Sequence, residues 1–544
     1  MIYWLMKSGE TDKRKRDYEK IGFLILMLIM AVYYIYRLFA LTPWYDELYT
    51  YYYFISRGPV YAAIHWPVPN NHVGYSVLSG FLDYIGNPYF GLRGISFLCA
   101  LANMALLFKI GRCWLNKGLS LAAVILYVSM GLVNHLAMQG RGYTLGVTCF
   151  LTAFHCLIQI CGERACKEWY YYIFMSSLVL GLYTLTSDVY WVLPICFTGG
   201  FYLLYRGILE AGEEGRKMRE CKSIRKLVKL ILFSVAAAFI TIILYAIIWL
   251  AIGSNLLVKD ENSIYFGMGH VQLILKAPFK ALFSGIDYML STPYIQSVER
   301  EGFLGRFLDW LKLLLNWYYD GFWAVIAGIV VLGIICLIIT IVCGIKKREN
   351  ILFPLFLLDG IICLPLFLMI QCALPYYRVF LYGGALLALL TVFLVQFLLK
   401  RLIIQNSSDN QMEKRIATFF FLAVILFAAS RFGWKGYQDQ YGMREYYIQD
   451  ALANSHIEQM ENLCVTDCTQ QYLVKFLYDI TCENTQIEGT DLLLLDRKMT
   501  DPDYNEMEWE FYHYYHTIPW EYVNNNMEKI YENEDFVLYE KRRG

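Results

Sequence analysis

Residues 21–47 read IGFLILMLIMAVYYIYRLFALTPWYDE, an apolar run that ends on the adjacent acids Asp46 and Glu47. The run is long enough to cross the hydrocarbon core of a bilayer, which takes ~20 apolar residues in a helix. Acidic side chains beside a membrane-spanning segment are costly to place near lipid, and they usually mark a site. The stretch therefore predicts a membrane helix that delivers an acid pair to one face of a bilayer.

Bulk composition agrees with a membrane protein. Of the 544 residues, 58% are hydrophobic and only 17% are charged, whereas soluble domains carry about 25% charged residues. The formal net charge is +0, so no basic field indicates a nucleic-acid partner. The first apolar run has spanning length and no small-residue cleavage site follows it, so we expect it to stay as an anchor.

Apolar runs of similar length recur along the chain and predict an α-helical polytopic protein with about eleven transmembrane helices. The expected spans are 21–41, 89–110, 118–136, 142–161, 169–187, 189–207, 227–252, 322–344, 351–371, 376–399 and 415–431.

Loop charge predicts the orientation. The basic clusters at 7–20, 216–226, 346–348 and 400–415 all fall on one side if eleven spans alternate. Cytoplasmic loops carry the excess of Lys and Arg. We therefore expect a multi-pass plasma-membrane protein with its N-terminus in the cytoplasm and its C-terminus outside.

Three segments then lie outside. Loop 42–88 carries the acid pair, and loop 253–321 contains two amphipathic stretches, 271–290 and 302–318, that suit helices lying in the headgroup plane. Residues 432–544 turn polar, and their short apolar runs alternate with helical patterns. The chain thus divides into a membrane module, 1–431, and a small extracytoplasmic α/β domain.

Cysteines of this small domain raise the question of a disulfide. Cys464, Cys468 and Cys482 lie outside by the expected topology, but three cysteines leave the pairing open.

Several short motifs lie outside the membrane or near its outer face. In chain order they are Asp46-Glu47, Asn70-Asn71-His72, Gly91-Leu92-Arg93-Gly94-Ile95-Ser96, Gln139-Gly140-Arg141-Gly142-Tyr143, Tyr183-Thr184 and Pro375-Tyr376-Tyr377-Arg378-Val379. Their order and placement resemble bacterial relatives of the dolichyl-phosphate-mannose protein O-mannosyltransferases. The set is also similar to the lipid A aminoarabinose transferases. Both belong to the GT-C membrane glycosyltransferases, and the resemblance covers most of residues 20–400.

The resemblance implies roles for the residues in these motifs. Asp46 would act as the catalytic base, with Glu47 as a helper or structural neighbour. Arg141 and Arg378, with Arg93 as a further candidate, would bind the phosphate of the donor. The other substrate-site candidates are Asn71, His72, Tyr143 and Asp188.

Two positions depart from the family pattern. His72-Val73 stands where many relatives have His-Pro, so the local turn is expected to differ. Asp188 stands where a neutral residue is expected, which points to a different acceptor or to a cation contact.

The function that follows is an inverting glycosyltransferase that uses a polyprenyl-phosphate sugar. A carboxylate can take the proton of an acceptor hydroxyl, and arginines can bind the departing phosphate. The acceptor is a glycan, a lipid or a protein, membrane lipids surround the chain, and no nucleic acid takes part. No cofactor beyond the lipid-linked donor is expected. Whether a divalent cation takes part, and which residues would bind it, is left open. The alternatives are a transporter or flippase of a lipid-linked glycan, and a scaffold for the C-terminal domain.

Each candidate also has a simpler interpretation. Asp46 and Glu47 could cap the helix that starts near Leu48, because acids favour a first turn. The arginines could extend to lipid headgroups. The tyrosines at 49 and 51–53 are typical of an interfacial belt.

Overall fold

The computed structural model describes most of the chain between Tyr18 and Arg542. The described residues are 18–65, 71–116, 118–162, 166–215, 217–252, 256–259, 261, 263, 265–291, 302–371, 374–405, 410–432, 443–482, 484–504 and 514–542.

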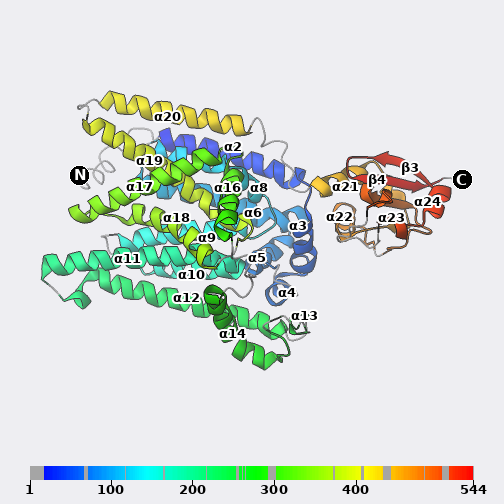
Figure 1. The fold of residues 1–544 in the computed structure, drawn as a ribbon, viewed down its shortest axis with the longest axis horizontal. Coiled ribbons are helices and arrows are strands. Elements are labelled where there is room, and N and C mark those ends of the chain that lie inside the picture. The colour runs from blue at the N-terminus through cyan, green and yellow to red at the C-terminus, as the bar shows by residue number, and fades with distance from the viewer. Residues whose placement is uncertain are drawn as a thin grey trace.

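Up to residue 431 the chain forms a body of long helices that run side by side (Figure 1). In the described part, eight helices are long and apolar enough to cross a membrane. They are α2 (Tyr18–Ala40), α6 (Pro88–Trp114), α9 (Tyr143–Cys161), α11 (Val189–Glu214), α12 (Lys222–Ile252), α17 (Trp323–Lys347), α18 (Leu352–Gln371) and α19 (Tyr382–Gln405). The expectation of a helical polytopic membrane protein is confirmed at this level.

The other three expected spans also coincide with helices, but of a different kind. The third is a pair, α7 (Leu119–Val128) and α8 (Gly131–Ala137), that bends by 70° between its two parts. The fifth, α10 (Trp169–Thr184), has 16 residues. In the last, α20 (Asn410–Arg431), only Thr418–Arg431 is strongly apolar. The bent pair raises the count of candidate spans to nine, and eleven stays a prediction.

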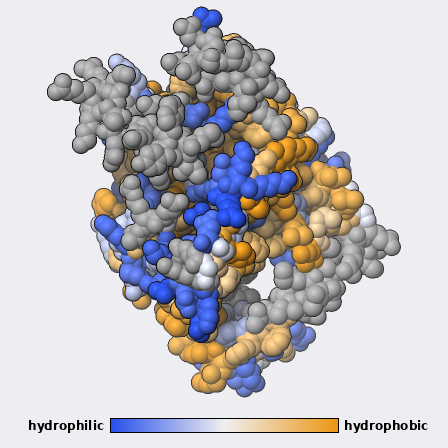
Figure 2. All heavy atoms as spheres, turned by 90° about the vertical axis from the view of Figure 1, so that its left-hand side faces the viewer, coloured by the Kyte–Doolittle hydropathy of each residue, from blue (hydrophilic) through white to orange (hydrophobic). Residues whose placement is uncertain are grey.

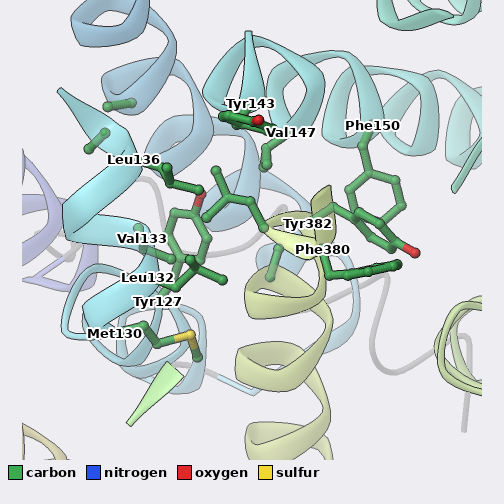
Figure 3. Packing of buried hydrophobic residues seen from close by; sticks show 14 of the residues in the cluster. Tyr127, Met130, Leu132, Val133, Leu136, Tyr143, Val147, Phe150, Phe380 and Tyr382 are labelled. Carbon is green, nitrogen blue, oxygen red and sulfur yellow. The ribbon is translucent and has the colours of Figure 1, made fainter. Parts of the chain in front are cut away.

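The helices differ in the fraction of their residues that is buried. The most buried helices form the centre of the body, and the least buried ones form a rim that faces lipid. In the apolar parts of α9 and α19, 78% and 72% of the residues are buried, against 17% for α12 and 22% for α17. Large apolar side chains stay exposed along α12, as expected for a helix whose solvent is lipid. At the centre, Phe150 of α9 packs on Tyr382 of α19 with ring centroids 5.5 Å apart (Figure 3). This packing fixes the start of α19 against α9.

The two ends of the helical body differ in charge. The loops that follow α11, α17 and α19 lie at one end, which we call the basic end (Figure 1). Figure 2 views that end, where hydrophilic residues gather across the middle and hydrophobic ones lie around them. The opposite end faces the sheet near the C-terminus and is called the domain end (Figure 1).

Several further helices, from 3 to 22 residues long, cover the domain end. They are α3 (Tyr45–Thr50), η1 (Tyr51–Ile55), α4 (Pro59–Ile64), α5 (Val73–Asp83), η2 (Thr186–Asp188), α13 (Leu256–Lys259), α14 (His270–Ser291), α16 (Phe303–Tyr318) and η4 (Tyr377–Phe380); η3 (Met218–Glu220) lies at the basic end instead. On α16, Phe303, Phe307 and Trp310 face the body and are buried, while Leu304 and Leu308 are exposed. Both α14 and α16 are amphipathic, as the sequence predicts.

The C-terminal part folds as a small α/β unit. Its elements are α21 (Met443–Ala453), η6 (Ile457–Gln459), β1 (Leu463–Cys464), α22 (Cys468–Tyr478), β2 (Leu492–Asp496), η7 (Arg497–Thr500), α23 (Tyr514–Thr517), α24 (Trp520–Asn526), β3 (Met527–Glu532) and β4 (Phe536–Lys541). The strand order is β1-β2-β4-β3. The β1–β2 pair is parallel and the other pairs are antiparallel. Cys464, Cys468 and Cys482 are all free, so none of them forms a disulfide here.

The C-terminal unit docks on the loop that carries the acid pair. Tyr45 N donates to Glu445 Oε1 at 2.8 Å, and Thr42 Oγ1 donates to Gln449 Oε1 at 2.6 Å. Tyr52 stacks on Tyr472 with ring centroids 5.8 Å apart. The ring of Tyr52 thus packs against another part of the protein, and the interfacial belt stays a prediction.

The arrangement of the two ends leads to a labelling prediction. If the basic end is cytoplasmic, Glu488→Cys in an exposed turn of the C-terminal unit should react with a membrane-impermeant maleimide on intact cells. Lys347→Cys at the basic end should react only after lysis. The signal is read against the parent protein, because native Cys113 and Cys343 are exposed. The reverse pattern would invert the orientation.

Candidate functional site

The acid pair sits in the first turn of α3, directly after α2 ends. Pro43 lacks a backbone N–H, and the chain restarts as a helix with Tyr45 as its first residue. Asp46 Oδ2 accepts from Arg378 Nη1 of η4 at 3.0 Å. The two side chains are 22% and 23% exposed. The ion pair therefore lies at the protein surface with access to solvent.

Aromatic rings hold the Arg378 guanidinium in place. Its central carbon lies 4.9 Å from the ring centroid of Trp44, 5.2 Å from that of Tyr376 and 5.7 Å from that of Tyr143. Such contacts each stabilise by roughly 0.5–2 kcal/mol. Arg378 is thus fixed in position above the acid.

Arg141 reaches the same place from the other side. Its Nη1 donates to Thr50 Oγ1 at 2.6 Å, and that hydroxyl donates to Asp46 O at 2.7 Å. Its Nη2 lies 3.2 Å from His72 Nε2. Both arginines of the predicted phosphate site are therefore linked to Asp46, one through the carboxylate and one through the backbone.

His72 is buried between these cations. Burial lowers its pKa well below the ordinary value of 6.5, and the charges of Arg141 and Arg378 add to that effect. Its Nδ1 accepts the N–H of Gly142 at 2.8 Å, so in the neutral ring the proton sits on Nε2. That proton then points at the Arg141 guanidinium, donor against donor. An anionic oxygen that accepts from both groups at once would offset this repulsion.

Glu47 and Arg93 form a second ion pair beneath the surface, and both side chains are 0% exposed. Arg93 Nε and Nη2 donate to the two Glu47 oxygens at 2.8 Å each. Arg93 Nη1 also donates to Leu38 O and Leu41 O, at the end of α2. The geometry suits the supporting role expected of Glu47. It does not bring Arg93 to the open site, because a phosphate would have to displace these partners.

Three further candidates have distinct surroundings. Asn71 Nδ2 donates to Ala62 O and His65 O, so this amide ties the loop together. Tyr143 meets the His72 ring edge to face at 4.9 Å and so belongs to the site. Asp188 is buried, and its Oδ2 has no hydrogen-bond partner within the described residues.

Asp188 packs against glycines of two neighbouring helices. A Cβ on Gly146 would come within 2.8 Å of Asp188 Oδ2, and one on Gly181 within 3.3 Å. The carboxyl is therefore wedged between α9 and α10, which carry these glycines.

No metal cluster is evident: where the structure describes the chain, no three His, Cys, Asp or Glu side chains come together in a way that could hold an ion.

Sequence reasoning missed several contributors. Thr50 lies one helical turn after Asp46, so the i, i+4 spacing on α3 could have identified it. Trp44 adjoins the acid pair and supplies a ring face to Arg378. Glu445, which binds the first N–H of α3, lies 400 residues away along the chain and gives no local signal.

Comparison with known proteins leaves the family open. No protein-family model matches the chain, and no curated protein matches it. The GT-C resemblance therefore rests on the sequence motifs alone.

The two acids should differ sharply in their effect on stability. Glu47→Gln removes one partner of a fully buried pair, a change that typically lowers stability by about 3–5 kcal/mol. Asp46→Asn, at a partly exposed pair, should change it by no more than ~1 kcal/mol. Thermal unfolding of both purified variants in lipid nanodiscs measures the contrast. Equal melting temperatures would mean that the Glu47–Arg93 pair does not hold the fold together.

His72 should make stability depend on pH. The unfolded histidine takes up a proton below about pH 6.5 while the folded one stays neutral, so stability present above that pH is lost as pH falls. The loss approaches about 1.4 kcal/mol per pH unit. Melting temperatures between pH 7.5 and 5.5 should therefore fall more steeply for wild type than for His72→Gln. Parallel curves would show that His72 is not held neutral.

Proposed function

We propose that the protein transfers a sugar from a polyprenyl-phosphate donor to an acceptor hydroxyl at the domain end, with inversion of the anomeric carbon. The observation that carries the proposal is the hydrogen bonding of the Asp46 carboxylate. One oxygen is oriented by Arg378, and the other, Oδ1, has no hydrogen-bond partner among the residues that the structure describes. A carboxylate held by one oxygen and open at the other is suited to accept a proton.

The reaction balances with the groups present. The acceptor oxygen attacks the anomeric carbon, its proton passes to Asp46, and the bond from that carbon to the phosphate oxygen breaks. The phosphate leaves with the bonding electrons and gains negative charge. Arg378 is positioned to bind that charge, and the donor contact between His72 and Arg141 offers a second place for an anionic oxygen. Attack opposite the leaving group inverts the anomeric centre.

The geometry also bears on the simpler interpretation of the acids. A capping carboxylate would accept backbone N–H groups of its own helix. Glu47 does so, because its Oε2 accepts Trp44 N at 3.3 Å. The Asp46 carboxylate is bound instead by a side chain 332 residues away. This arrangement favours a chemical role for Asp46 and a structural one for Glu47.

A transporter of a lipid-linked glycan is the second candidate. The bend of 70° between α7 and α8 is the feature that favours it, because broken helices often line transport sites. The ion pairs, however, lie around α3 and η4 at the domain end. Transport sites usually lie near the middle of the membrane, so we prefer the transferase.

Transfer can be measured with synthetic polyprenyl-phosphate hexoses and pentoses, as release of polyprenyl phosphate in the presence of membrane acceptors. Asp46→Asn should lower the rate by roughly 10²–10⁴-fold while donor binding is largely kept. Arg378→Ala should weaken donor binding, and Arg378→Lys should restore it only in part, because an ammonium lacks the planar fork.

Asp309→Asn and Arg306→Ala are matched controls, since both residues are exposed on α16, and neither variant should change transfer. Normal transfer by a well-folded Asp46→Asn protein would exclude the general-base role.

A further inference from the structure

A cavity of about 270 Å³ lies at the domain end, at the junction of α8, α16 and the end of α20. That volume is large enough to hold several water molecules, and it suits a single small ring. Its polar and aromatic lining includes Asn134, His135, Asn316, Trp317, Asp320 and Arg431. No role has been assigned above to any of these residues.

Two amides in the lining have unmet acceptors. Asn134 and Asn316 each have a buried Oδ1 with no hydrogen-bond partner within the described part of the chain. The orientation of Asn134 is fixed, because its Nδ2 donates to Val128 O at 2.6 Å and to Met130 O at 3.1 Å. An unpaired buried acceptor costs about 1–3 kcal/mol. A ligand hydroxyl could pair with the Asn316 oxygen once that side chain turns toward the cavity, whereas Asn134 keeps its orientation.

The charges of the lining do not select an anion. Arg431 and Asp320 contribute one charge of each sign, and the Arg431 guanidinium lies 5.7 Å from the ring of Phe322. A phosphate site would need an excess of cations. The cavity is therefore suited to a neutral molecule that has several hydroxyl groups.

Trp317 gives the cavity an aromatic wall. Its ring meets the edge of His135 at 5.8 Å and lies 6.0 Å from the ring of Tyr377. An amphipathic ring of this kind can cover the apolar face of a sugar while polar groups bind its rim. Tyr377 directly precedes Arg378, which binds Asp46. The rings of Trp317 and Tyr377 therefore lie between the cavity and the acid site.

We propose that this cavity is a subsite for one neutral sugar ring, bound by hydrogen bonds to its polar lining residues and by packing on Trp317. That the sugar is part of the acceptor rests on the proposed function. The binding itself does not, because it involves neither Asp46 nor the donor.

The test is direct binding of methyl hexosides to the full chain in lipid nanodiscs, measured by saturation-transfer NMR without any donor. Sugar-headed detergents are avoided because they would compete. Leu313 lines the cavity and is 49% exposed, so Leu313→Trp should fill the cavity without unfolding the chain. Leu308→Trp is the matched control, because Leu308 is 56% exposed on the same helix and does not line the cavity. Trp317→Ala is a second, independent variant.

We expect at least one methyl hexoside to bind to wild type and to Leu308→Trp alike. Leu313→Trp and Trp317→Ala should each weaken binding about tenfold or more, a loss of ~1.4 kcal/mol. Undiminished binding by both cavity variants would overturn the proposal, as would binding of inorganic phosphate in place of glycosides. Retained glycoside binding alongside normal transfer by Asp46→Asn would reject the proposed function and leave the subsite standing.

Discussion

The buried ion pair between Glu47 and Arg93 is the interaction on which the domain end depends. Two charges placed away from water are tolerated only when almost all of their hydrogen-bonding capacity is used. Each Glu47 oxygen accepts two hydrogen bonds, one from Arg93 and one from a backbone N–H, of Gly140 or of Trp44. Arg93 also binds the carbonyls that end α2. One pair thus joins α2, α3, α6 and the segment before α9.

This pair also determines where Asp46 points. Successive residues of an α-helix project about 100° apart, so a Glu47 fixed inward turns its neighbour toward the side of α3. Arg378 lies there, held over three aromatic rings. The two adjacent acids therefore have different surroundings. Glu47 is fully buried, and both of its oxygens are hydrogen-bonded. Asp46 is partly exposed, and one of its oxygens is bound by Arg378.

Local patterns in the sequence were enough to predict the helices, because burial in a membrane demands long apolar runs wherever the chain crosses. Even the weaker spans coincide with helices, although α10 is short and α20 is apolar only in part. The motif residues Asp46, Arg141, His72, Tyr143 and Arg378 do meet in space, as their common placement near one face suggested.

Pairings between distant segments could not be predicted in this way. The sequence offers both Arg93 and Arg141 as candidates for the phosphate, and only the fold shows that one is bound by Glu47 while the other adjoins His72. The same holds for Tyr52, whose partner Tyr472 lies in the C-terminal unit. Apolar periodicity reports which face of a segment is buried, but not what covers it.

Contacts from the docked C-terminal unit help to determine the geometry of the acid site. Helix α3 has only six residues, far fewer than an isolated helix needs to be stable in water, so its conformation depends on its contacts. Its first N–H, on Tyr45, is bound by Glu445 of the C-terminal unit. Burial raises the pKa of that carboxyl, and the hydrogen bond from Tyr45 opposes the rise. Helix α3, which presents Asp46, is therefore held by Arg93 through Glu47 and by Glu445 at its N-terminus. Separating the C-terminal unit from the helical body would release Asp46 from its position beside Arg378.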